Sequence, residues 1–202
     1  PTASAIAPRT SFRVSVAILT DRQLTYIKPV KRSREVAGRK AYSVPSPPAS
    51  MASDIDALRT VADYQFGAGA GAALFEGDVV VQRTGSGRPQ QILADGERVV
   101  SYGTDGRFTL GVAGGLRLQR ALEAPAYRVV VGDDSEPFVR EERNVFAKFV
   151  QRVDPQIRPG DEVLVEHDRG DLLAVGRAEL SADAMADFGT GMAIKIRDGR
   201  PA

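Results

Sequence analysis

The 202-residue sequence predicts an α+β protein in which two small folded modules follow a disordered, basic N-terminal extension. Three observations support this. The charge balance changes sign at Met51, short apolar runs alternate with turn signals from there to residue 200, and these runs are densest over residues 144–165. Residues 126–200 contain about five predicted strands and two short helices, a ratio typical of a small closed or nearly closed barrel.

Residues 1–50 form the basic extension. They carry nine Lys or Arg and two Asp or Glu, a balance of +7, whereas residues 51–202 carry 18 and 24, a balance of −6. Pro, Ser and Ala dominate the extension, and residues 46–50 have the composition of a linker, which predicts disorder. The segment is either an upstream extension without a fold of its own, with the true start at Met51, or a basic arm that binds RNA.

The composition excludes several kinds of site. The chain has no Cys, so disulfides and thiolate chemistry are absent and a reducing cytoplasm is the expected compartment. It has one His, so we expect neither a metal site built on His and Cys clusters nor a cofactor. No apolar run reaches the length of a membrane span, so no membrane partner is expected. From Met51 onward 16 of 18 cations are Arg, which suits phosphate and base contacts but also follows from a GC-rich genome.

Residues 51–125 predict a small α+β module. Ser53 is a candidate N-cap for a helix that runs to about Tyr64. Three alternating glycines, Gly67 to Gly71, suggest a phosphate cradle, but a dinucleotide site needs a strand before them, and here a helix precedes. A helix C-cap with close packing is therefore preferred. The remaining predicted elements are strands at 78–83, 90–93, 97–102 and 108–112 and a helix at 115–121.

Residues 126–200 predict the second module, with the stretch 144–165 at its centre. Two apolar runs in this stretch are separated by a turn at Pro159 and Gly160. Lys148 interrupts the first run, so it must point out of the pleat or lie on a bulge or loop, and it is the first candidate for contact with a partner. The other predicted elements are strands at 128–131, 172–180 and 192–197, a helix opening at 133–137, and a helix capped by Ser181 that runs to Phe188.

No set of residues predicts catalysis, and we expect a protein that is not an enzyme. Asp161 and Glu162 are adjacent, so on a strand they face opposite sides and cannot act as an acid–base pair. His167 stands between Glu166 and Asp168 at a predicted turn, where a solvated loop is preferred to a catalytic dyad. No nucleophile–base pair and no phosphate-binding loop is visible.

Five sequence blocks in order make residues 126–199 resemble a PUA domain. They are Arg-Val-Val-Val from 128, Asn-Val-Phe-Ala-Lys-Phe-Val from 144, Arg-Pro-Gly-Asp-Glu-Val-Leu-Val from 158, Leu-Ala-Val-Gly-Arg-Ala from 173, and Gly-Met-Ala-Ile-Lys-Ile-Arg-Asp-Gly from 191. The preceding module, with blocks at 62–67 and 106–110, resembles the domain before PUA in archaeal archaeosine tRNA-guanine transglycosylases. Nothing in the sequence resembles the catalytic barrel of those enzymes.

The resemblance implies an RNA surface made by the first helix of the PUA domain, the loop after it and the last strand. Many PUA domains have Pro-Gly where this chain has Ala147 and Lys148. Cations on such a surface would neutralise phosphates, although Lys195 and Arg197 could instead mark the wet face of an edge strand. Phe146 and Phe149 are expected in the core. The residues carried over are Arg143, Asn144, Phe146, Ala147 and Lys148 from the loop and Lys195 and Arg197 from the strand.

The function that the resemblance implies is recognition of structured RNA, such as the acceptor stem of tRNA, because duplex RNA is read mostly by shape and 2′-hydroxyls. Two alternatives remain open. The protein could be a non-catalytic subunit that delivers tRNA to a transglycosylase or archaeosine-forming enzyme. It could also be a protein-interaction module without RNA binding, which the −6 balance from Met51 onward favours.

Overall fold

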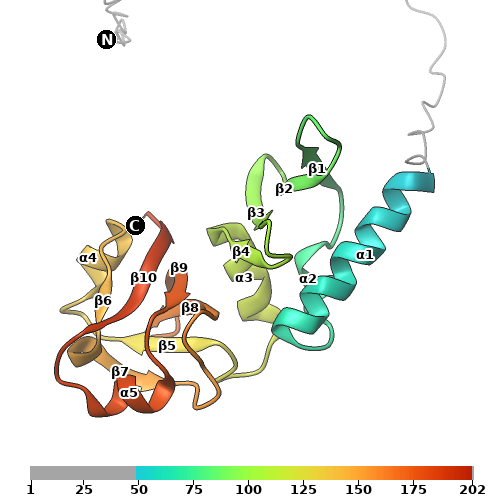
Figure 1. Ribbon diagram of the computed structural model, residues 1–202. Coiled ribbons are helices and arrows are strands. Elements are labelled where there is room, and N and C mark those ends of the chain that lie inside the picture. Colours follow the sequence, from blue (N-terminus) through green and yellow to red (C-terminus); the bar gives the residue numbers. More distant parts are fainter. Residues whose placement is uncertain (1–48, 202) are drawn as a thin grey trace, which may run out of the picture. The chain divides into compact units, whose positions relative to one another are not determined.

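The computed structural model describes residues 49–201, and their side chains from Asp54 onward. The predicted disorder of the extension therefore falls almost entirely outside the described residues. Helix α1 begins at Ala49, so Ser53 lies inside the helix and the predicted N-cap is wrong. The described residues form two modules that succeed each other along the chain (Figure 1).

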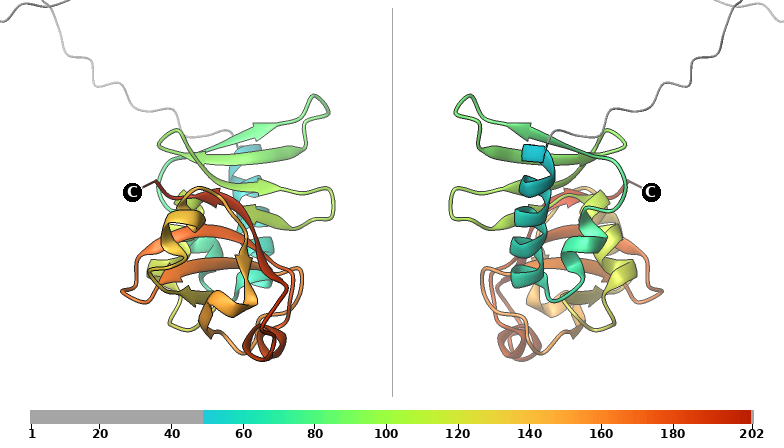
Figure 2. Two further views of the ribbon diagram at one scale, coloured as in Figure 1. Left: turned by 90° about the vertical axis from the view of Figure 1, so that its left-hand side faces the viewer. Right: turned by 90° about the vertical axis from the view of Figure 1, so that its right-hand side faces the viewer.

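The first module combines three helices with an antiparallel sheet in the order β1-β2-β3-β4. Helix α2 packs against α1 and α3, and α3 packs against β3 and β4 (Figure 2). α3 begins three residues before its predicted start, and β4 is two residues shorter than predicted. The elements are α1 (Ala49–Phe66), α2 (Ala70–Leu74), β1 (Val79–Arg83), β2 (Pro89–Ala94), β3 (Glu97–Tyr102), β4 (Phe108–Leu110) and α3 (Val112–Ala121).

The second module is a six-stranded sheet in the order β6-β10-β9-β8-β5-β7, antiparallel except between β5 and β8. Its two edge strands, β6 and β7, are joined directly by the turn η1, which brings the sheet edges together into a nearly closed barrel. The elements are β5 (Arg128–Val131), α4 (Glu136–Arg140), β6 (Val145–Phe146), η1 (Ala147–Phe149), β7 (Val150–Val153), β8 (Glu162–His167), β9 (Leu172–Ala178), α5 (Ala182–Asp187) and β10 (Met192–Gly199).

The first apolar run of the central stretch is interrupted rather than continuous. It forms β6, then the 3-10 turn η1, then β7, so one predicted strand becomes two. Lys148 lies in η1, which confirms that it would avoid a buried strand position. The turn places the lysine on the outside of the corner where the barrel closes.

The two modules share apolar packing. Leu164, Leu172 and Val175, on β8 and β9 of the barrel, belong to the apolar core of the first module. α3 approaches these strands so closely that a Cβ added at Gly115 would lie 2.5 Å from Val175 Cγ1, which leaves glycine as the residue that fits. The outer face of β8 and β9 therefore packs against the apolar core of the first module.

Buried polar contacts also connect the modules. Arg128 donates from Nε to Glu166 Oε1 at 2.7 Å and from Nη2 to the carbonyl oxygens of Gln119 and Leu122. Glu166 on β8 holds the guanidinium through Nε, and Nη2 bonds to a carbonyl oxygen of α3 and to one just after it, so Arg128 fixes the end of α3 on the barrel. Within residues 49–201 no helix combines the length and apolar character that crossing a bilayer requires.

Candidate nucleic-acid interface

The loop that carries five of the predicted RNA contacts is held against β10. Val145 pairs with Ile194 and Phe146 with Met192. The backbone N–H of Ala147 donates to the carbonyl oxygen of Gly191 at 2.9 Å. Each contact ties the loop to the last strand or the segment before it, as the resemblance implied.

Two of the five loop residues serve this attachment. Asn144 accepts at Oδ1 a hydrogen bond of 3.0 Å from the backbone N–H of Ile196. The Ala147 side chain is buried in the barrel core. Direct RNA contact by Asn144 and Ala147 stays a prediction, and their observed contacts are those that hold the loop in place.

The other three loop residues, Arg143, Phe146 and Lys148, are exposed. Phe146 is 46% exposed, so its expected place in the core is wrong, whereas Phe149 is half-buried against the core. Lys148 Nζ lies 4.7 Å from the centre of the Phe149 ring, a cation–π contact. Arg143 makes a similar contact, 5.5 Å from the ring of Phe138 on α4.

Two further aromatic residues are missed by the sequence reasoning. Phe138 is 51% exposed on α4, and Phe188 is 53% exposed where α5 ends. Phe188 belongs to the same region because the segment after it, at Gly191, is bonded to Ala147 and α5 packs against η1. An available signal was that α4, with five residues, cannot bury both Phe138 and Val139. We call Phe138, Arg143, Phe146, Lys148 and Phe188 the aromatic rim.

Three residues of the rim, Phe138, Arg143 and Phe146, line a predominantly apolar recess of about 270 Å³. Its walls come from α4, from the loop and from η1, so three consecutive elements build one concave surface. A recess with aromatic walls and cations at its edge can take a stacked nucleobase and pair the neighbouring phosphate. The lining residues are Ser135, Phe138, Val139, Arg143, Asn144, Val145, Phe146 and Phe149.

The strand half of the predicted surface has different surroundings. Lys195 and Arg197 alternate on β10 with the buried Ile194 and Ile196, so they project from the outer face of the sheet. Arg197 Nε donates to Glu162 Oε1 at 3.0 Å. Lys195 makes no ion pair within residues 54–201.

Glu162 explains why Arg197 is held there. The glutamate is 4% exposed and also accepts, at Oε2, a hydrogen bond of 3.0 Å from the backbone N–H of Leu110 in the first module. Burial raises the pKa of Glu162, and the bonds from Leu110 and Arg197 offset part of that rise. Arg197 therefore neutralises a buried carboxylate at the junction of the modules.

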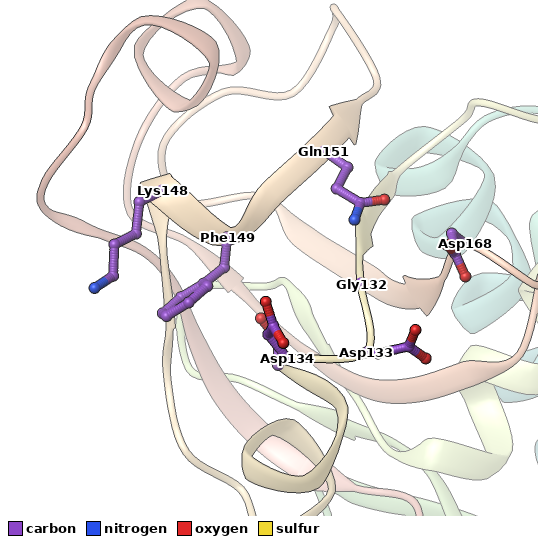
Figure 3. A pocket seen from close by; sticks show the side chains of 8 residues that line it. Gly132, Asp133, Asp134, Lys148, Phe149, Gln151 and Asp168 are labelled. Carbon is purple, nitrogen blue, oxygen red and sulfur yellow. The ribbon is translucent and has the colours of Figure 1, made fainter.

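An acidic pocket of about 270 Å³ adjoins the rim (Figure 3). Asp133, Asp134 and Asp168 contribute its carboxylates. In Figure 3 the ring of Phe149 stands between Lys148 and Asp134, and the ammonium group of Lys148 points away from the carboxylates. The lysine charge is thus directed outwards.

His167 contradicts the prediction of a solvated loop. It is 1% exposed, with Nε2 lying 3.1 Å from Asp133 Oδ1 and 3.5 Å from Glu136 Oε2. One histidine and two carboxylates this close together are a possible metal-ligand set. However, Arg169 donates to both carboxylates, at 2.9 and 2.7 Å, so oxygens that could bind a metal ion are already paired with a guanidinium. The hydrogen bond from Arg169, followed by that from Arg140, lowers the pKa of Glu136, and the cluster forms an ion-pair network at the start of α4.

Family comparisons identify the two modules separately. Residues 56–125 match the patch-forming domain C2 of tRNA-guanine transglycosylase, and residues 127–200 match the PUA domain. The tRNA-guanine(15) transglycosylase of Methanothermobacter thermautotrophicus is 44% identical over 148 residues, which are 72% of this chain and 23% of that enzyme. The enzyme of Pyrococcus furiosus is 44% identical over 143 residues, 70% of this chain and 24% of the enzyme. The chain thus spans about a quarter of the length of these relatives.

Two solved structures have a similar fold. A hypothetical protein from Pyrococcus horikoshii aligns with a TM-score of 0.59 and 22% identity over 73% of this chain and 90% of its own. A PUA domain protein from Thermoplasma acidophilum aligns with a TM-score of 0.54 and 19% identity over 75% of this chain and 91% of its own. Residues 56–125 are therefore a patch-forming C2 domain of the tRNA-guanine transglycosylase type, and residues 127–200 are a PUA domain.

Proposed function

We propose that this protein binds structured RNA through the aromatic rim. The observation that carries the proposal is that the exposed Phe138, Phe146 and Arg143 line one apolar recess. Lys148 lies beside it, over the ring of Phe149, which also lines the recess. Exposed aromatic rings contribute little to the stability of the chain itself, whereas stacking of a base on such a ring contributes about 1–3 kcal/mol to RNA binding. Arg143 and Lys148 supply phosphate contacts beside the rings.

The RNA class that we propose is tRNA. The relatives are named as tRNA-guanine(15) transglycosylases, and they align with this chain over both modules. Because the −6 balance of residues 51–202 opposes long-range attraction of RNA, shape and stacking must supply much of the affinity. The end of an RNA stem fits this combination, because its paired bases offer shape and its unpaired bases can stack on the rings.

A second proposal concerns the partner. The relatives that align with both modules are named as tRNA-guanine(15) transglycosylases, which favours an accessory, non-catalytic role for these modules beside a tRNA-modifying enzyme. The compartment that we propose is the cytoplasm, where tRNA and such enzymes are found together. Co-purification of the protein with a transglycosylase or an archaeosine-forming enzyme, in the presence and absence of ribonuclease, tests this role. If no such enzyme is recovered in either condition, the accessory role is wrong.

Mobility shift with tRNA tests the RNA proposal. The double variant Arg143→Glu with Lys148→Glu replaces the two rim cations with carboxylates, and we expect its affinity for tRNA to fall about tenfold or more. Its thermal unfolding midpoint should stay near that of the wild type, since both side chains are exposed. Unchanged affinity in a folded double variant, or absence of binding by the wild type at low salt, would refute the proposal.

A further inference from the structure

Tyr64 has the most exposed side chain among the large hydrophobic residues between Asp54 and Pro201, at 94%. It lies on α1, in the first module, outside the aromatic rim. Single exposed aromatic residues are common on protein surfaces. Tyr64 differs because it stands between two recesses, of about 700 and 300 Å³, and lines both.

The backbone that carries Tyr64 is held rigidly. The next residue, Gln65, donates from Nε2 to the carbonyl oxygen of Phe108 at 2.8 Å and accepts at Oε1 from the N–H of Phe108 at 2.7 Å. The carbonyl oxygen of Gln65 also accepts from the Tyr127 hydroxyl at 2.7 Å, and Phe66 packs edge-on against Tyr127. Because the backbone at Tyr64 is already fixed, a flat ligand that stacks on the ring has to order only that side chain.

The recess walls offer groups that suit a nucleotide. Arg107 is exposed at the smaller recess and Arg158 at the larger one, and guanidinium groups there suit phosphate oxygens. Both carboxylate oxygens of Asp161 already accept hydrogen bonds, from Arg107 and from the N–H of Arg158. Asp183 is exposed and accepts no hydrogen bond within residues 54–201, so it remains available as an acceptor.

The larger of the two recesses, which we call the Tyr64 recess, is connected to the aromatic rim by α5. The start of this helix, Ser181 to Asp183, lines the larger recess, and its end carries Phe188 of the rim. Six helical residues span about 9 Å, so an RNA strand that leaves the rim has a short path to Tyr64. The two surfaces therefore belong to one potential RNA path rather than to unrelated sites.

We infer that the Tyr64 recess binds one unpaired nucleotide of the RNA, with its base stacked on Tyr64 and its exocyclic amino group donating to Asp183. This inference rests on the proposed RNA function. Adenine, cytosine and guanine carry an exocyclic amino group and uracil does not, so the recess selects against uridine. The carboxylates of Asp161 and Asp183 in the lining would repel a phosphate. They favour entry of the base instead, because its amino group can donate to a carboxylate. Arg107 or Arg158 then holds the phosphate outside.

Fluorescence anisotropy with three hairpin RNAs tests the inference on the full chain. One hairpin ends bluntly, and the others carry a short unpaired extension of cytidines or of uridines. The wild type should bind the cytidine extension about tenfold more tightly than the blunt hairpin. Tyr64→Ala should bind the extended hairpin no more tightly than the blunt one, with its affinity for the blunt hairpin unchanged. Tyr64→Phe should still prefer the cytidine extension, because the ring remains. Asp183→Asn should reduce the preference for cytidine over uridine several-fold.

The outcomes separate this inference from the proposed function. Loss of blunt-hairpin binding in the Arg143→Glu and Lys148→Glu variant, with no gain from any extension in the wild type, would support the rim and overturn the Tyr64 recess. An extension gain that persists in Tyr64→Ala would also overturn it. So would a photoreactive tyrosine analogue at position 64 that crosslinks protein but no RNA. Absence of all RNA binding by the wild type would refute both. Val80→Ala, at another exposed hydrophobic residue, is the matched control and should change nothing.

Discussion

The two halves of the predicted RNA surface differ in what their side chains contact. On the loop half, Arg143 and Lys148 lie over aromatic rings and point into solvent. On the strand half, Arg197 is bonded to a buried glutamate, and its neighbour Lys195 lies opposite Arg177 of β9. The two halves are adjacent in the sheet, since β6 and β10 are paired, yet they face different environments.

This difference shows that a cation in a family position has to be judged by its partners. A cation over an aromatic ring can rotate towards a phosphate. A cation that neutralises a buried carboxylate cannot turn away without leaving the carboxylate charge buried and unpaired, which would destabilise the fold. We therefore expect variants of the loop half to change RNA affinity with little effect on stability. Variants of Arg197 should change stability with little effect on RNA affinity.

The largest effect is expected when rings are removed from the loop half. The double variant Phe138→Ala with Phe146→Ala deletes two exposed rings that line the apolar recess. If each stacks on a base, affinity for tRNA should fall about thirtyfold or more, because stacking contributes about 1–3 kcal/mol per base and two stacks are lost. Anisotropy with a labelled tRNA measures this loss. Leucine at both positions keeps apolar area without a stacking face and should lose most of the same affinity.

A marked loss of stability in this variant would contradict the expectation that the loop half affects RNA affinity and not the free energy of unfolding. Phe138 and Phe146 are about half exposed, so each alanine should lower the free energy of unfolding by only about 1 kcal/mol, roughly half the value for a fully buried phenylalanine. A larger loss would mean that the rings belong to the core.

The next effect is on stability and comes from the strand half. Arg197→Ala removes the cation from Glu162, and we expect a loss of about 1–2 kcal/mol in the free energy of unfolding at neutral pH. This is less than for a fully buried pair because Arg197 is partly exposed to solvent. Urea unfolding measures the loss. Lys195→Ala, on the same face of the same strand, is the matched control and should change stability very little.

The pH dependence identifies Glu162 as the cause. Because burial raises its pKa in the folded state, folding binds protons between the unfolded and folded pKa values, and stability falls as pH rises through that window. Arg197 lowers the pKa of Glu162, so removing Arg197 raises the folded-state pKa further and extends to higher pH the range over which stability falls. The loss in Arg197→Ala should be smaller at pH 5 than at pH 7, and Glu162→Gln in the same chain should remove the difference. A pH-independent loss would mean that Arg197 acts through packing alone.

Much of the fold was predictable because its elements repeat simple patterns. Turn glycines and alternating strands predict the sheet of the first module, and Ser181 caps α5 as expected by accepting from the N–H of Ala184 at 3.3 Å. The corner at η1 was only half predictable. The pattern placed Lys148 outside the pleat, but it could not show that the chain would turn there to close the barrel.

The errors occurred where tertiary contacts decide the outcome. His167 lies among charged neighbours in the sequence, which suggests a loop, yet parallel pairing of β5 with β8 brings it beside Asp133. Phe146 has the apolar character of a core residue, but its neighbour Val145 takes the inward position. Likewise, Glu162 lies 35 residues from Arg197 in the chain, so no local pattern could reveal their pairing.

The smallest expected effect tests the two lysines directly by salt dependence. Each cation that releases a counterion from a phosphate contributes slightly less than one to the slope of log affinity against log salt concentration. Lys148→Gln should therefore reduce the slope by about one, because its ammonium group points outwards beside the rim. Lys195→Gln should leave the slope unchanged if RNA touches only the loop half. Equal reductions in both variants would show instead that RNA crosses from the loop onto β10, and that Arg197 alone is reserved for the glutamate.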